Sequence, residues 1–175
     1  VPRKEGYIRD HAKITEFLHP DHSKVILLDN NFTASPRRDK NLDYLIDSGL
    51  KVCFNQGLDI RLVNEELAAK LAEVEYFDWH FQRRQLYFAY DTMQVGEAVK
   101  KGVRLLTEAG IHPRRLMFYV LVGFNTTPRQ DLERVRTLID LNTDPYVMRY
   151  NQTEGPHRIL KHLARWVNWR IYRTT

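Results

Sequence analysis

Five segments of the chain end in side chains that can bind a polar ligand. Each segment is rich in apolar, β-branched or aromatic residues and finishes in amides, a carboxylate or a guanidinium. The carboxyl ends of parallel strands meet at one edge of a sheet or barrel, where α/β proteins place their active sites. We therefore expect these ends to bind a ligand with hydroxyls, amines or a purine edge. The candidate binding residues are Asp29, Asn30, Asn31, Asn55, Gln56, Asp91, Gly123, Asn125, Arg149 and Asn151.

The same segments offer no recognisable nucleophile. The sequence contains no G-x-S-x-G elbow, no P-loop and no G-x-G-x-x-G. Cys53, the single cysteine, lies inside an apolar segment where a buried core thiol is expected. Asp59 and Arg61 either clamp a ligand or form an ion pair within a loop, and both interpretations stay open. No residue is assigned a catalytic or metal-ligating role, so a cofactor would have to supply any difficult chemical step.

The spacing of the apolar segments predicts repeated βαβ units. The segments begin at residues 24, 51, 85, 115 and 145, and one βαβ repeat needs about 30 residues. Helix signals lie between them: Ser35-Pro36 as a start, Gly49 as an end, Asn64 as an N-cap, and Thr127 with Gln130 as a capping box. Near-continuous apolar strands are typical of a parallel sheet covered on both faces. The expected fold is α/β, a parallel (β/α) partial TIM-type barrel of about five βα units; a doubly wound sheet remains the alternative.

Length and composition set the class of protein. The chain has 175 residues, a net charge of +5 and no apolar run of membrane-spanning length, which suits a globular protein with a weak preference for anionic partners. A single cysteine excludes an internal disulfide framework and favours a reducing, cytoplasmic location. We expect the partial barrel over residues 1–156 and a basic amphipathic helix packed on it over residues 157–175.

Four strings in the sequence together match a known pattern. They are LLDNNF (27–32), FNQGLDIR (54–61), MFYVLVGFNTT (117–127) and PYVMRYN (145–151). With these strings the chain resembles the radical S-adenosylmethionine superfamily, and within it the Fe–S oxidoreductases of unknown substrate.

The resemblance implies a cofactor and a reaction. In that family a C-x3-C-x2-C loop after the first strand binds a [4Fe–4S] cluster, which cleaves S-adenosylmethionine reductively to give a deoxyadenosyl radical. A V-P-x-x-E-G string follows the last of those cysteines, as VPRKEG does at Val1. The three cysteines and the first strand are absent here, so we expect an inactive fragment of a larger enzyme that uses an electron donor such as a ferredoxin or flavodoxin.

The resemblance also suggests roles for the strand ends. Asp29, Asn30 and Asn31 stand where the family meets the amino group of the cofactor. Asp91 stands where polar groups meet its ribose. The remaining correspondences place Gly123 and Asn125 against adenine, and Arg149 and Asn151 against adenine or substrate.

Two other functions are compatible with the sequence. One is an ordinary (β/α)-barrel enzyme acting on a small polar substrate, which would need an acid–base pair such as Asp29 with Asp91. The other is an RNA-binding module, because residues 157–175 mix basic and aromatic side chains that can contact phosphates and stack on bases. The same run also fits a helix whose apolar side packs on the barrel; that side is Leu160, Leu163, Trp166 and Val167.

Overall fold

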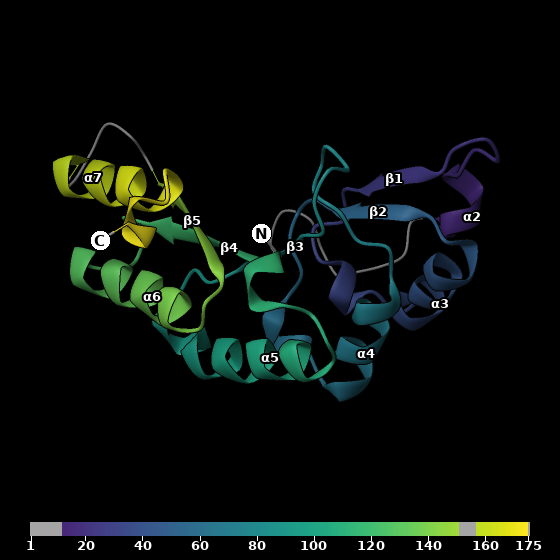
Figure 1. The fold of residues 1–175 in the computed structure, drawn as a ribbon, viewed down its shortest axis with the longest axis horizontal. Helices are drawn as coiled ribbons and strands as arrows, with labels where there is room; N and C mark the ends of the chain where they lie inside the picture. The colour runs from purple at the N-terminus through teal and green to yellow at the C-terminus, as the bar shows by residue number, and fades with distance from the viewer. Residues whose placement is uncertain (1–11, 151–156, 175) are drawn as a thin grey trace.

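The structure is a computed structural model that describes residues 12–150 and 157–174. These residues form a mixed α/β fold in which helices alternate with parallel strands (Figure 1). The strands are β1 (Lys24–Leu27), β2 (Lys51–Phe54), β3 (Leu86–Ala89), β4 (Leu116–Val122) and β5 (Asp144–Arg149). The helices are α2 (Ile14–Phe17), α3 (Arg38–Ser48), α4 (Glu65–Glu73), α5 (Gly96–Glu108), α6 (Pro128–Asp140) and α7 (His157–Asn168). The predicted α/β class with parallel strands is confirmed.

The strands follow one another in chain order. β1 pairs with β2, and β3, β4 and β5 form a second sheet in that order, with every pairing parallel. A bridge between Leu58, just beyond β2, and Phe88 of β3 links the two sheets, and the Leu58 N–H donates to the Tyr87 carbonyl at 2.7 Å. Within the described ranges the strands do not close into a barrel. The helices α3, α4, α5 and α6 run along one side of the strands (Figure 1).

Local capping residues set the ends of several helices. The Asn64 side chain accepts from the Leu67 N–H at 2.8 Å at the start of α4, and Thr127 forms a capping box with Gln130 at the start of α6. Gly49 ends α3 in the left-handed region, at φ 63°. These three predictions are confirmed. The start of α3 differs, because Ser35 instead ends a short 3-10 helix, η1 (Phe32–Ala34), and α3 begins at Arg38.

The core lies between the strands and the helices on that one side. Alternate residues of β4 are buried and half-buried, and β1 and β5 expose the side chains between their buried ones. The exposed fractions of Ile26, Tyr146 and Met148 are 43%, 40% and 38%. The expectation that helices cover both faces is therefore wrong for β1 and β5 within the described part of the chain, because α3 to α6 pack on one face.

Helix α7 covers the free edge of β5. Leu160, Leu163 and Val167 are buried, and the Asn168 side chain accepts from the Val147 N–H at 2.8 Å and donates to the Val147 carbonyl at 3.0 Å. The amide of Asn168 thus replaces a neighbouring strand at this position. The predicted boundary between the partial barrel and the C-terminal helix, at residues 156 and 157, stays a prediction, because residues 151–156 lie outside the described ranges. None of the helices in the described ranges combines the length and the apolar character that crossing a bilayer requires.

Candidate binding site

A pocket of about 290 Å³ lies at the carboxyl ends of β1, β2 and β3. We call it the strand-end pocket. Its polar lining comes from three different strand ends and from the turn that follows β2, so residues far apart in sequence share one cavity. The polar side chains that line it include Asn30, Asn31, Gln56, Asp59, Arg61 and Asp91.

One wall of the pocket is a hydrogen-bonded network centred on Asp59. The Arg61 guanidinium donates to both carboxylate oxygens of Asp59, from Nε at 2.8 Å and from Nη2 at 2.6 Å. Asn31 Nδ2 lies 3.4 Å from Asp59 Oδ2, and the Asp59 N–H donates to the Thr33 hydroxyl at 2.9 Å. The loop after β1 and the loop after β2 are therefore joined through Asp59.

Asp59 is ionised despite being partly buried. Burial raises the pKa of its carboxyl, but the hydrogen bonds and positive charge of Arg61 outweigh that effect and hold the pKa below its ordinary value. The same contact raises the pKa of Arg61, whose side chain is 63% exposed. From the sequence alone, Asp59 and Arg61 could either clamp a ligand or form an ion pair. The structure shows the ion pair and places both residues in the pocket lining.

The predicted site residues divide into those that share this pocket and those that do not. Asn30, Asn31, Gln56 and Asp91 line it, whereas Asp29 and Asn55 do not. Asp29 is exposed, and the Asn55 N–H donates to the Leu27 carbonyl, which extends the β1–β2 pairing.

The later strand ends lie outside the strand-end pocket. Gly123 belongs to a turn at φ 75° after β4, and Asn125 in the same turn is exposed. Arg149 lines a different groove, between β5 and α7. Asn151 lies outside the described residues.

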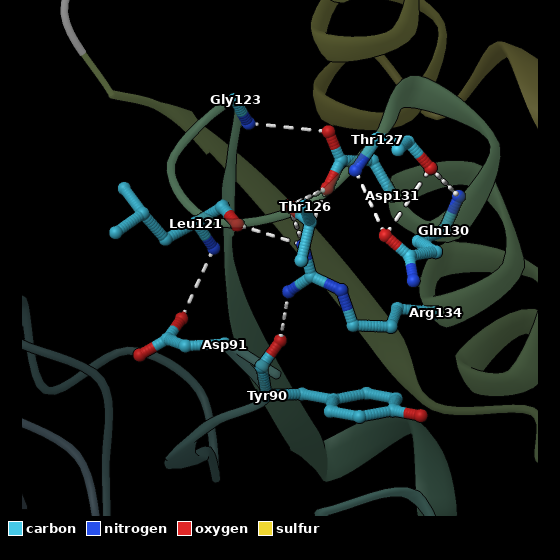
Figure 2. Close-up of polar contacts among 9 residues, drawn as sticks. All are labelled: Tyr90, Asp91, Leu121, Gly123, Thr126, Thr127, Gln130, Asp131 and Arg134. Carbon is cyan, nitrogen blue, oxygen red and sulfur yellow. Dashed lines mark hydrogen bonds and ion pairs between the residues drawn. The ribbon is translucent and has the colours of Figure 1, made fainter. Parts of the chain in front are cut away.

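A buried ion pair holds the ends of β3 and β4 together beside this pocket (Figure 2). The side chains of Asp131 and Arg134, both from α6, are fully buried, and Arg134 Nη2 lies 2.6 Å from Asp131 Oδ1. Arg134 also donates to the Tyr90 carbonyl at 2.5 Å and to the Leu121 carbonyl at 2.8 Å. Since Tyr90 precedes the pocket residue Asp91, this arginine fixes the backbone from which Asp91 projects.

Asp91 takes part in the same arrangement. Its Oδ1 accepts from the Leu121 N–H at 3.1 Å (Figure 2), so its carboxylate continues the pairing of β3 with β4 beyond the last residue of β3. The Asp131 carboxylate accepts hydrogen bonds from the Gly123 N–H, at 3.1 Å, and from the Thr126 hydroxyl. This pair could not be predicted from the sequence, because helical periodicity indicates apolar positions and does not show which carbonyls lie opposite.

The single cysteine does not provide a metal or nucleophile site. Cys53 is fully buried in β2, and burial, together with the nearby charge of Asp78, raises the pKa of its thiol to about 11. The thiol is therefore protonated at neutral pH and poorly suited to bind iron. Among the described residues, no group of three histidine, cysteine or acidic side chains is arranged to hold a metal ion.

Comparisons with known proteins return nothing similar: the chain matches no family model, no curated protein and no solved structure.

Proposed function

We propose that the strand-end pocket binds S-adenosylmethionine and that the chain is a partial TIM-type barrel from a radical S-adenosylmethionine Fe–S oxidoreductase. The observation that carries the proposal is the meeting of Asn31, Gln56 and Asp91 in one pocket, since these residues come from three separate strand ends. The chain order of the parallel strands, with α3 to α6 along one side, supports the barrel part of the proposal. The single cysteine favours a cytoplasmic location.

The donors and acceptors of the pocket fit the polar groups of this cofactor. S-adenosylmethionine carries a sulfonium and an ammonium group, a carboxylate, a ribose diol and an adenine edge. The Asp91 carboxylate suits the cationic groups or the diol, and the amides of Asn30 and Gln56 suit the adenine edge. The Arg61 side chain, which is 63% exposed, suits the carboxylate. When bound beside a reducing cluster, the cofactor supplies a deoxyadenosyl radical. The residues of this chain bind and orient it.

The iron–sulfur cluster does not fit the residues of this chain. Such a cluster needs three cysteine thiolates if S-adenosylmethionine occupies the fourth iron, and the sequence contains only Cys53. That thiol is buried and protonated. The proposal therefore takes the cluster ligands from outside these 175 residues, together with an electron donor such as a ferredoxin or flavodoxin, and expects no cleavage by the chain alone.

An ordinary barrel enzyme is less well supported. That function would need Asp29 and Asp91 to act as an acid–base pair. Asp91 lines the strand-end pocket, whereas Asp29 is exposed and does not. The proposal therefore keeps Asp91 as a binding residue and gives Asp29 no role in the pocket.

Isothermal titration calorimetry with S-adenosylmethionine tests the pocket. Asp91→Asn keeps a carbonyl oxygen for the Leu121 N–H and removes the charge, and a charge-assisted hydrogen bond is worth about 1.5–3 kcal/mol. We expect this variant to bind about 10- to 150-fold more weakly than the wild type. Asp29→Asn is the matched control, because it makes the same change at a strand end outside the pocket lining, and it should bind within about twofold of the wild type. Equal effects of the two variants, or no binding by the wild type at millimolar concentration, would contradict the proposal.

A longer protein tests the enzymatic part separately. A form extended before Val1 that supplies a C-x3-C-x2-C loop should bind iron on anaerobic reconstitution and release 5′-deoxyadenosine under strong reduction. A reconstituted protein without iron, or with iron but no 5′-deoxyadenosine, would refute the radical chemistry while leaving the binding result standing.

A further inference from the structure

A second and larger cavity, about 470 Å³, lies between β5 and α7. We call it the β5–α7 groove. On α7 its lining residues are spaced three and four apart, so they share one face of the helix, and the opposite wall comes from β5. The side chains used below are Tyr146 and Arg149 from β5, and Lys161, Arg165, Asn168 and Trp169 from α7 and its end.

The two walls of the groove are held in fixed register. Asn168 bonds both backbone groups of Val147, as described above, and therefore ties the last turn of α7 to the middle of β5. Leu160 and Leu163, on the other side of α7, are buried. The helix consequently presents its 161–165 face to the groove while its apolar side is occupied in packing.

The charged side chains that line the groove are all positive. Arg149, Lys161 and Arg165 line it, and no acidic residue is among its described lining residues. Two other arginines of the same C-terminal run behave differently, because Arg170 and Arg173 both pair with the buried carboxylate of Asp144, at 2.6 and 2.9 Å. The basic run thus divides into cations that stabilise the fold and cations that face the groove.

Exposed aromatic side chains stand beside these cations. Trp169 is 69% exposed and Tyr146 is 40% exposed, which are large fractions for aromatic residues. Tyr146 meets the Tyr119 ring edge-on, with the ring centroids 6.1 Å apart. The Arg165 guanidinium lies 4.8 Å from the centroid of the Trp169 ring. A flat ring next to a guanidinium is the combination that stacks on a nucleobase and contacts its phosphate.

We propose that the β5–α7 groove binds single-stranded nucleic acid, with phosphates at Arg149, Lys161 and Arg165 and bases stacked on Trp169 and Tyr146. A duplex does not offer its base faces to such rings, so single strands are the form that fits. The positive charge of the groove favours an anionic chain as the ligand, and the exposed rings favour an anionic chain that carries planar groups. This site is separate from the strand-end pocket and does not depend on the function proposed for it.

Fluorescence anisotropy with a labelled twelve-nucleotide oligouridylate tests the proposal. Three neutralised phosphates give a slope of about −2 for the logarithm of affinity against the logarithm of salt concentration, so a rise from 50 to 200 mM salt should lower the affinity about 20-fold. Lys161→Gln should reduce the slope to about −1.4. Trp169→Ala should lower the affinity about 5- to 150-fold, the usual loss for one stacking ring.

Two matched variants separate the groove from general basic or aromatic surface. Arg158→Gln removes an exposed cation of the same helix that does not line the groove, and Trp79→Ala removes a ring that is 59% exposed elsewhere. Both should bind the oligonucleotide like the wild type. All four substitutions lie at exposed positions, and circular dichroism should show unchanged helix content.

Several results would overturn the proposal. These are no binding at 100 µM protein in 50 mM salt, equal losses in the groove variants and in the two controls, or equal affinity for a duplex of the same length. Binding to vesicles containing phosphatidylserine in place of the oligonucleotide would assign the groove to a membrane surface. Displacement of the oligonucleotide by adenosine monophosphate at matched nucleotide concentration would assign it to free nucleotides.

Discussion

Substitution of Arg134 tests how the fold positions the strand ends. Arg134→Met keeps most of the side-chain volume and removes the guanidinium, which has four acceptors: the carbonyls of Tyr90 and Leu121, the Thr126 hydroxyl and the Asp131 carboxylate. The Asp131 carboxylate would remain fully buried without its cation. Breaking a buried pair in this way costs about 3–5 kcal/mol, a large part of the roughly 5–15 kcal/mol by which a domain is stable.

Urea unfolding followed by far-UV circular dichroism measures this loss. With a slope of about 2 kcal/mol per molar urea, the midpoint of Arg134→Met should fall by about 1.5–2.5 M. Arg104→Met is the matched control, because Arg104 forms an exposed pair with Glu108 at 3.9 Å whose loss should change stability by less than about 1 kcal/mol.

A double variant separates the charge from the packing. Asp131→Asn added to Arg134→Met removes the unpaired carboxylate and keeps a carbonyl oxygen for the Gly123 N–H. The double variant should therefore be more stable than Arg134→Met alone. A loss below about 1 kcal/mol in Arg134→Met, or a double variant less stable than the single one, would refute the role assigned to this pair.

Three further predictions concern single positions. The unfolding free energy of the wild type relative to Cys53→Ala should be constant below about pH 8 and fall by up to roughly 2–3 kcal/mol as the pH approaches 11, because the folded state raises the pKa of the thiol to about 11 and so favours the protonated form. Urea titrations at each pH would show a flat difference if the reasoning is wrong. Asn168→Ala should lower the unfolding free energy by about 1–3 kcal/mol, because both hydrogen bonds to Val147 disappear. Native-state hydrogen exchange at the Val147 amide should accelerate, and unchanged exchange would contradict this. Gly49→Ala should lower the thermal midpoint, because an alanine at φ 63° costs roughly 1 kcal/mol of backbone strain. Beyond the two adjacent residues, no heavy atom lies within 4 Å of the added methyl group, so a clash adds nothing to this loss. An unchanged midpoint would show that the turn relaxes freely.

Local signals in the sequence predicted much of the fold. Gly49, Asn64 and Thr127 act through atoms within a few residues of themselves, so their capping roles can be read from the sequence. The spacing of the apolar segments likewise predicted the succession of strands. The exposed face of β1 and β5 could not be read in the same way, because Ile26 and Met148 are as apolar as their buried neighbours.

The sequence predicted the edge of the strands at which the strand-end pocket lies, but it predicted less well which residues line the pocket. Asn31, Gln56 and Asp91 line the strand-end pocket as strand-end residues, whereas Asp29 and Asn55 do not. The difference arises because side chains stop alternating where a strand ends, and the following loop then sets their direction. Asp59 lines the pocket because the turn after β2 brings it there. The string FNQGLDIR indicated this turn but did not show which way the chain turns.

Tertiary contacts explain what the sequence did not show. Asp131 and Arg134 look like surface residues of an amphipathic helix until the carbonyls of Tyr90 and Leu121 are placed opposite them. The β5–α7 groove has a similar origin. The spacing of Lys161 and Arg165 was visible, but their approach to β5 depends on the docking of α7.

An NMR titration of the ¹⁵N-labelled chain with S-adenosylmethionine tests the central claim most directly. Binding in the strand-end pocket predicts saturable shifts at the backbone amides of Asn31, Gly57, Asp91 and Thr92, which lie in its lining. The amides that line the β5–α7 groove, such as Met148 and Arg165, should stay unchanged. Shifts confined to the groove, or no shifts at millimolar S-adenosylmethionine, would contradict the account.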